Sequence, residues 1–317
     1  MFFVLFVLGF VLLIKGADIL VEGSSSLAKK FRISNFIIGL TVVAFGTSAP
    51  ELVVSGLASY QGSGDIAISN VLGSNIANTL LILGSTALIC PLVVHNRTVR
   101  REIPLNFFSI FLLFLLSNDA LIYGVQKSFI SRVDASILLF TFVIFLFFTF
   151  RSSSSRVDGE EFSEEPVLKS ILFILLGLLG LSIGGKWIVD GAIQIAQYFG
   201  VSKSFVGLTI IAIGTSLPEL AASIMAAMKK NPDLAIGNAL GSNLFNSFWI
   251  LGSSALINPL PFDISNNIDL VVFFGACVLL TFFIVFGKRL TIIKWEGAVM
   301  LLAYLGYLSY LVLQQAS

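Results

Sequence analysis

The six residues "GTSAPE" (46–51) place a proline and a glutamate inside a long apolar stretch, and nearly the same letters recur as "GTSLPE" (214–219). Pro50 has no amide hydrogen and its ring clashes with the carbonyl four residues back, so the helix that carries it is kinked or broken. Backbone groups freed in this way inside a bilayer need another partner. We therefore expect the carbonyls around Ala44 and Gly46 to lack their helical partners and to be available to a ligand.

The chain around these motifs is far more apolar than a soluble domain. Of its 317 residues 56% are hydrophobic and only 12% are charged, and the mean hydropathy is +0.97. Because a span needs about 20 apolar residues, the sequence predicts an all-α membrane protein with ten transmembrane helices. Their expected ranges are 2–22, 35–60, 66–90, 103–119, 129–150, 167–187, 203–228, 233–257, 268–287 and 292–313. Charges at the end of the first range predict a retained helix rather than a signal peptide.

The distribution of basic residues predicts the orientation. If the N-terminus is outside, most of the 19 lysines and arginines fall in cytoplasmic loops, as the positive-inside rule requires. We therefore expect a multi-pass protein of the cell (inner) membrane with its N-terminus and C-terminus outside. A net charge of +1 gives no indication of nucleic acid binding, and the oligomeric state stays open.

An internal duplication organises the chain. Residues 39–91 and 207–259 align without a gap, at a shift of 168 positions, and are identical at more than half of their positions. We expect a first five-helix repeat (1–150), a cytoplasmic linker (151–166), which is an acidic, solvated run, and a second five-helix repeat (167–317). Because five is odd, the second repeat runs through the membrane in the opposite sense. Inverted repeats of this kind are typical of secondary transporters, whose sites form at broken helices where the halves meet.

The polar residues of each repeat share helical faces. In the first repeat Ala44, Thr47, Ser48 and Glu51 follow at three- and four-residue steps. The second repeat supplies Ala212, Thr215, Ser216 and Glu219 on the same plan, and the motifs "NVLGSNIAN" (70–78) and "NALGSNLFN" (238–246) add Ser74, Asn78, Ser242 and Asn246. A proline with hydroxyl residues in one span is commonly a simple kink, but two matched copies, each with a costly intramembrane glutamate, indicate a site. Oxygen-only ligands suit hard cations such as Ca²⁺ and Na⁺.

Other polar residues are expected to be structural. Cys90 and Cys277 have no metal-ligand spacing and are expected to be small buried residues, while His95 is expected to be a solvated loop residue. Asp65 and Asp233 begin helices after short loops, where N-terminal capping accounts for them. Charged residues near span ends, such as Asp18, are expected to snorkel or pair locally.

The two motif pairs resemble the alpha-repeats of the sodium/calcium exchanger family, within the wider calcium/cation antiporter superfamily. The resemblance covers the ten expected spans, the inverted halves and both motif pairs, and the short linker is similar to prokaryotic members without a large regulatory loop. It implies a 5+5 helix fold with four central cation sites, one selecting Ca²⁺ and the others Na⁺, loaded alternately from each side and without a cofactor.

The resemblance also implies ligand roles. Glu51 and Glu219 would be the shared Ca²⁺ carboxylates, and the Na⁺ and Ca²⁺ shells would be completed by Thr47, Ser48, Thr215, Ser216, the carbonyls of Ala44 and Ala212, and Ser74, Asn78, Ser242 and Asn246. Some relatives, the potassium-dependent branch among them, carry Asp at the position of Asn246, which argues against K⁺ co-transport. Proton-coupled relatives typically have Asn where Thr47 and Thr215 stand, which favours Na⁺ as the counter-ion.

Three functions remain open at this point. The leading interpretation is an electrogenic, secondary active Na⁺/Ca²⁺ antiporter that works by alternating access. The alternative is a Ca²⁺/H⁺ antiporter with the same carboxylate site, since a buried carboxylate can release Ca²⁺ by taking up a proton. A cation channel is a third hypothesis, although channels commonly build their filter from several subunits. An enzyme is not expected, because the sequence has no nucleophile–base pairing and no phosphate-cradling loop.

Overall fold

The structure is a computed structural model that describes residues 2–124, 126–151, 165–198, 212–288 and 290–316. Within these ranges helices make up nearly all of the fold, and strands occur only as two short antiparallel pairs. The prediction of an all-α membrane protein is therefore confirmed. Most of the expected linker (151–166) and the start of the seventh expected span (203–228) lie outside the described residues.

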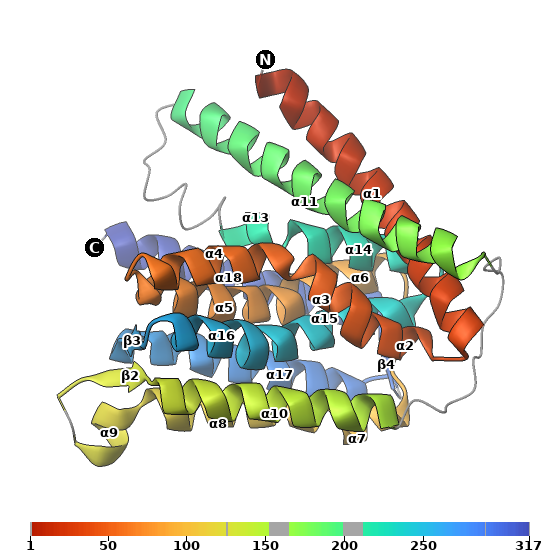
Figure 1. Cartoon of the computed structure of the whole chain (residues 1–317). Coiled ribbons are helices and arrows are strands. Elements are labelled where there is room, and N and C mark those ends of the chain that lie inside the picture. Colours follow the sequence, from red (N-terminus) through yellow and green to blue (C-terminus); the bar gives the residue numbers. More distant parts are fainter. Residues whose placement is uncertain (1, 125, 152–164, 199–211, 289, 317) are drawn as a thin grey trace.

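The elements follow the chain in two series (Figure 1). The first series is α1 (Phe2–Phe31), α2 (Asn35–Ile38), η1 (Gly39–Val43), α3 (Ala44–Thr47), α4 (Ala49–Tyr60), α5 (Gly64–Ile76), η2 (Ala77–Ile82), α6 (Leu83–Ile89), β1 (Leu92–Val93), α7 (Asn96–Arg100), α8 (Glu102–Ser117), α9 (Asp119–Tyr123), β2 (Ser128–Ile130) and α10 (Arg132–Arg151). The second series is α11 (Val167–Tyr198), α13 (Ala212–Thr215), α14 (Leu217–Met228), α15 (Pro232–Leu244), η4 (Phe245–Ile250), α16 (Leu251–Ile257), β3 (Leu260–Phe262), η5 (Ile264–Asn266), α17 (Asn267–Phe286), β4 (Thr291–Ile292) and α18 (Lys294–Ala316).

Helices lie in all ten ranges that were expected to span the membrane, but only some of them are long enough alone. Six described helices are long and apolar enough to cross a bilayer, and the bent pair Asn35–Thr47 and Ala49–Tyr60 makes a seventh. The number ten therefore stays a prediction. The Gly64–Ile89 span is the most enclosed, with 72% of its apolar window buried against 28% to 39% for the other five. This span therefore lies at the centre of the bundle.

The long helices α1 and α11 pack against each other along their length and cross obliquely over the rest of the bundle (Figure 1). They run in opposite directions, since Gly9 lies against Gly184 and Gly16 against Gly177. A Cβ atom added to Gly16 would lie 2.8 Å from the Gly177 carbonyl oxygen, so the close approach of the two backbones requires glycine there. Equivalent first helices of the two repeats thus form one antiparallel pair, as the inverted duplication predicts.

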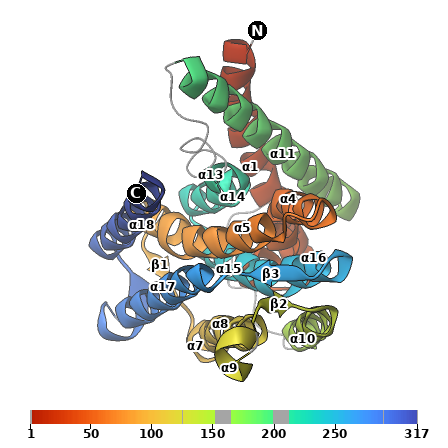
Figure 2. The same ribbon diagram turned by 90° about the vertical axis from the view of Figure 1, so that its left-hand side faces the viewer.

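Strand pairs and helix contacts also join the two series to each other. Strand β1 pairs with β4, and β2 pairs with β3, so each strand pair joins one series to the other. Helix α18 packs against α6, while α10 packs against α16. Figure 2 shows α10 and α18 at opposite flanks of the bundle. The last helix of each series, α10 or α18, therefore packs against a helix of the other series.

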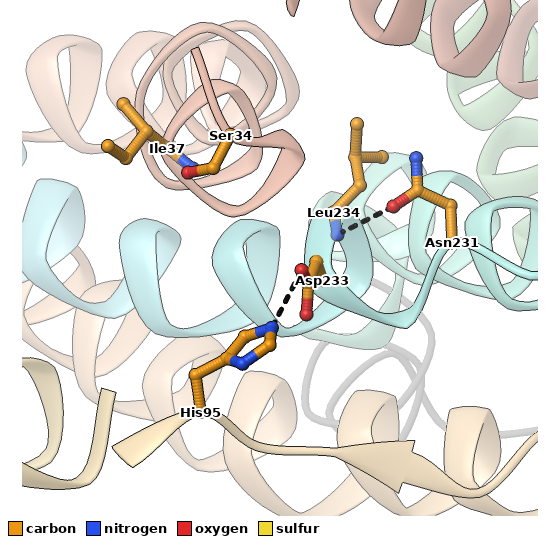
Figure 3. Close-up of polar contacts among 6 residues, drawn as sticks. All are labelled: Ser34, Ile37, His95, Asn231, Asp233 and Leu234. Atoms are coloured by element: carbon orange, nitrogen blue, oxygen red, sulfur yellow. Dashed lines mark hydrogen bonds and ion pairs between the residues drawn. The ribbon is translucent and has the colours of Figure 1, made fainter. Parts of the chain in front are cut away.

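The start of α15 corrects one expectation about capping. The side chain that caps this helix belongs to Asn231, which accepts a hydrogen bond from the Leu234 amide at 3.3 Å (Figure 3). Asp233 lies in the first turn instead and contacts the His95 Nε2 atom at 3.1 Å. Pro232 favours this arrangement, because proline is preferred at the first helical position directly after the cap. At the start of α5 the cap residue is Ser63 rather than Asp65.

Candidate functional site

The repeated motif breaks its helix as predicted. Helix α3 ends at Thr47 and α4 begins at Ala49 with Pro50 in its first turn, and the axis bends by 45°. The Ala44 carbonyl keeps its helical partner, contrary to expectation, because it accepts the Ser48 amide at 3.0 Å; it also lies 3.4 Å from the Thr47 hydroxyl oxygen. Proline removes the bond to the residue four positions earlier, which is Gly46 and not Ala44.

The second repeat has the same break between α13, which ends at Thr215, and α14, which begins at Leu217 with Pro218 in its first turn. Ala212 is the first residue of α13. Helix α11 contacts both α3 and α13. Glycines permit these contacts, since a Cβ atom on Gly46 would lie 2.5 Å from the Leu178 side chain of α11. One long helix therefore passes over both breaks.

The two glutamates lie where the repeats meet, and each is bonded to a serine of the other repeat. Glu51 and Glu219 are both 1% exposed. Ser48 Oγ donates to Glu219 Oε1 at 2.9 Å, and Ser216 Oγ lies 3.5 Å from Glu51 Oε1. Ser74 Oγ is 3.4 Å from Glu51 Oε1 and 3.3 Å from Ser216 Oγ. The structure thus brings five of the predicted site residues into one buried polar cluster.

Several oxygen atoms in this cluster and its surroundings are buried without a partner. Among the described residues no hydrogen-bond partner is found for the Oε2 atoms of Glu51 and Glu219, the Ser242 hydroxyl, or either amide atom of Asn78 and Asn246. Buried polar groups are almost always bonded in folded proteins, so a cluster of exceptions needs a reason. Carboxylate, hydroxyl and amide oxygens together fit a hard cation.

Asn78 and Asn246 lie in the matched π-helical turns η2 and η4. Such wide turns inside α-helices are rare and often occur at functional sites. Beside them, Asn75 Nδ2 donates to Ser247 Oγ at 2.9 Å, and Asn243 Nδ2 donates to Thr79 Oγ1 at 3.0 Å. These two bonds join the central helices of the two repeats across their interface.

Sequence reasoning missed two asparagines, Asn70 and Asn238. The Thr47 hydroxyl donates to Asn238 Oδ1 at 3.2 Å, and the Thr215 hydroxyl donates to Asn70 Oδ1 at 3.4 Å. A signal for them was present, since Asn70 precedes Ser74 by four residues, as Ser74 precedes Asn78, and all three share one helical face. The threonines of each motif therefore contact the second motif helix of the opposite repeat.

A cavity of about 400 Å³ lies between α4, α11 and the α13–α14 break. It reaches the site at Thr215, which lines it and is partly exposed, whereas Thr47 is 1% exposed. Lys186 and Asp190 of α11 also line this cavity. On the equivalent face of the other repeat, α1 packs against α14, and Asp18 pairs with Lys229 at 2.6 Å. Local pairing of Asp18 was expected and is confirmed, and the cavity reaches the site from the side of α4 and α11.

The remaining candidates lie away from the site. Cys277 is buried and Cys90 is partly exposed, and both are free thiols. The His95 side chain is 58% exposed. No group of three or more His, Cys, Asp or Glu side chains gathers within the described residues. Hydroxyl, amide and carbonyl oxygens therefore have to supply most of any cation shell.

Comparison with known proteins identifies the family. The family described as sodium/calcium exchanger protein matches residues 1–151 and 169–313. The chain is 40% identical to a putative antiporter, CaxA, of Alkalimonas amylolytica, over 94% of this chain and 95% of that protein. It is 32% identical to the sodium/calcium exchanger MaX1 of Methanosarcina acetivorans, over 96% and 97% of the two chains.

A structure of the sodium-calcium exchanger NCX_Mj, soaked with 2.5 mM Na⁺ and 0.1 mM Ca²⁺, superimposes with a TM-score of 0.83 at 33% identity and covers 97% of both chains. The vacuolar cation/proton exchanger 1a of rice, Oryza sativa subsp. japonica, is a more distant relative, 26% identical over 66% of this chain. The chain therefore belongs to the sodium/calcium exchanger protein family, and it is a multi-pass membrane cation antiporter rather than an enzyme.

Proposed function

We propose that the protein exchanges Na⁺ for Ca²⁺ by alternating access, with Glu51 and Glu219 as the shared carboxylate ligands. The observation that carries this proposal is the crossed pair of bonds from Ser48 to Glu219 and from Ser216 to Glu51. Two carboxylates give the site a charge of −2, which one Ca²⁺ neutralises. Thr47, Thr215 and the amides of Asn78 and Asn246 are the proposed neutral ligands for Na⁺.

Competition between the ions is the proposed mechanism. Both ions need the same oxygen atoms, so Ca²⁺ leaves when Na⁺ occupies the shared ligands. A set of buried oxygens without partners is costly to carry empty. Return without cargo is therefore unfavourable, which couples the two fluxes.

Alternation is proposed to occur by movement of the α1–α11 pair over the remaining helices. The pair packs tightly along its own length through glycine contacts, and α11 passes over both helix breaks. A shift of the pair would close the cavity beside α4 and open the equivalent space beside α14. The two five-helix repeats, residues 1–150 and 167–317, are the proposed units that exchange roles, and both termini are proposed to be outside, as the distribution of basic residues indicates.

The test is ⁴⁵Ca²⁺ uptake into proteoliposomes preloaded with Na⁺, compared with vesicles that hold K⁺ or choline. We expect uptake only with internal Na⁺, and we expect Glu51→Gln and Glu219→Gln each to abolish it. Glu296→Gln is the matched control, because Glu296 is also fully buried but accepts the Ile293 amide at 2.8 Å, outside the site. Normal exchange by either site variant would exclude the assignment of the carboxylates.

Proton coupling is the second candidate, because the rice cation/proton exchanger is a relative. The two threonines of the motifs favour Na⁺, as argued from the sequence. Uptake that follows an imposed pH gradient without Na⁺ would move the protein to the proton-coupled branch with the same site. Ca²⁺ flux with no counter-ion at all would indicate a channel.

A further inference from the structure

The amide group of Asn238 has a fixed orientation. Its Nδ2 atom donates to Ser223 Oγ at 3.0 Å and to the Glu219 carbonyl at 3.2 Å. With two acceptors on the nitrogen side, the oxygen atom Oδ1 has to point the other way, toward Thr47 of the opposite repeat. Asn238 is 0% exposed, so water offers no alternative partner.

Asn70 repeats this network in the first repeat. Its Nδ2 atom donates to Ser55 Oγ at 3.0 Å and approaches the Glu51 carbonyl at 3.4 Å. Its Oδ1 atom accepts from Thr215. Each asparagine therefore holds the backbone of the glutamate in its own repeat and the threonine of the other repeat.

A threonine hydroxyl has one proton and two lone pairs. The Thr47 hydroxyl lies 3.2 Å from Asn238 Oδ1 and 3.4 Å from the Ala44 carbonyl oxygen, so two acceptors compete for its proton. If the proton turned away from the asparagine and toward a bound cation, it would repel the cation. If it points to the asparagine, the lone pairs are free for the cation.

We propose that Asn70 and Asn238 are positioning residues, whose Oδ1 atoms accept the hydroxyl hydrogen bonds of Thr215 and Thr47 respectively and so leave the lone pairs of the threonine oxygens free to bind the transported cation. The inference rests on the proposed function, since it needs a cation beside the threonines. Neither asparagine contacts the cation through this interaction. Each asparagine acts across the interface, so a helix of one repeat orients the threonine hydroxyl of the other repeat.

The test is a double-mutant cycle in which the half-saturating Na⁺ concentration for Ca²⁺ uptake is measured for each variant. Asn238→Ala is expected to raise this concentration by about 3- to 10-fold, the change that one net hydrogen bond supports. In a Thr47→Val background, where the hydroxyl is absent, the same substitution is expected to have almost no further effect. In a Thr215→Val background it is expected to keep its full effect, because Thr215 pairs with the other asparagine.

Two further variants separate positioning from general damage. Asn243→Ala also removes a buried bond between the repeats, the one to Thr79, and is expected to lower thermal stability without changing the half-saturating Na⁺ concentration. If Asn238→Ala does not fold, the equivalent cycle uses Asn70→Ala with Thr215→Val, since Asn70 is only partly buried. An equal effect of the asparagine substitution in all three backgrounds would overturn the inference.

Direct binding distinguishes this inference from the proposed function. Thermal stabilisation of the purified protein by Na⁺ alone or Ca²⁺ alone reports binding without exchange. If Ca²⁺ stabilises the protein but Na⁺ does not drive uptake, the proposed counter-ion is wrong, and the cycle is read from the Ca²⁺ midpoint instead. If neither ion stabilises the wild-type protein, both proposals are overturned.

Discussion

Helix α1 packs directly against α14, whereas its repeat counterpart α11 is separated from α4 by a cavity of about 400 Å³. The duplicated sequence builds both faces. The face between α1 and α14 is closed and carries the Asp18–Lys229 ion pair, whereas the face between α11 and α4 is open as far as Thr215. At the register of the duplication, Asp18 corresponds to Lys186 and Lys229 to Gln61, so the open face has no ion pair at the equivalent positions. The two faces therefore differ in the structure although a duplicated sequence builds both, which is the asymmetry that the proposed alternating access requires.

Locking the open face is expected to have the largest effect. Val53 on α4 and Val189 on α11 both line the cavity. A short thiol cross-linker between Val53→Cys and Val189→Cys, in a chain without Cys90 and Cys277, is expected to abolish exchange, since α11 can no longer change its distance from α4. ⁴⁵Ca²⁺ uptake before and after cross-linking measures this. The single-cysteine variants treated with the same reagent are the controls, and full exchange after complete cross-linking would show that α11 does not have to move relative to α4.

Helices α1 and α11 pack against each other as one tight pair through glycine contacts. Gly16→Ala would force a Cβ atom to within 2.8 Å of the α11 backbone, and is expected to lower the free energy of unfolding by about 1–3 kcal/mol through overpacking. Denaturant unfolding in detergent measures the change. Gly185→Ala is the matched control on α11, because its Cβ atom would have room, 3.8 Å from Pro218. Equal destabilisation by both variants would show that the tight pair is not the cause.

Removing the ion pair of the closed face is expected to have a moderate effect. Asp18 and Lys229 have side chains that are 34% and 25% exposed, so their interaction is partly screened and contributes about 1 kcal/mol or less. Asp18→Asn is expected to shift the ratio of the two conformations by up to about fivefold toward opening of this face. A cysteine at Val53 would then react more slowly with a water-soluble thiol reagent. The charge swap Asp18→Lys with Lys229→Asp should restore the rate, and a failure to do so would assign the effect to packing.

Removing the polar contact at the start of α15 is expected to have the smallest effect on stability. Asp233 at the start of α15 is paired with His95, while its counterpart Asp65 at the start of α5 lines a second cavity. Because the His95 side chain is 58% exposed, His95→Gln is expected to change stability by only a few tenths of a kcal/mol. Thermal unfolding measures this. A loss of unfolding free energy as large as that of Gly16→Ala would show that the His95–Asp233 pair contributes far more to stability than a surface contact does.

The sequence was sufficient to predict the broken helices and the meeting of the two repeats. Pro50 and Pro218 act through local chemistry, so their effect on the helix does not depend on the rest of the fold. The crossed contacts of Ser48 and Ser216 follow from inversion of a duplicated motif. The roles of Asn70 and Asn238 could not be predicted in the same way, because they depend on which side-chain atoms lie across the interface.

The difference between the two faces was not predicted from the sequence. The nearly identical motifs predict similar faces, and the residues that differ, such as Lys229 and its counterpart Gln61, lie outside the motifs and act through contacts that only the folded structure shows. The exchange of last helices, with α18 on α6 and α10 on α16, is a matter of long-range packing that no local pattern records. The misassigned cap of α15 was different, since Pro232 after Asn231 was a local signal that could have been used.

The placement of α18 against α6 has a consequence for how the protein is made. Helix α18 (Lys294–Ala316) completes the packing of α6 (Leu83–Ile89), which is synthesised much earlier. Contacts between such distant segments form slowly and leave apolar and polar surfaces incomplete in the meantime. The packing of α6 therefore stays incomplete until α18 has been synthesised. A chain truncated before Lys294 would lack the partner of α6 and is expected to be a substrate for membrane quality control rather than a partly active transporter.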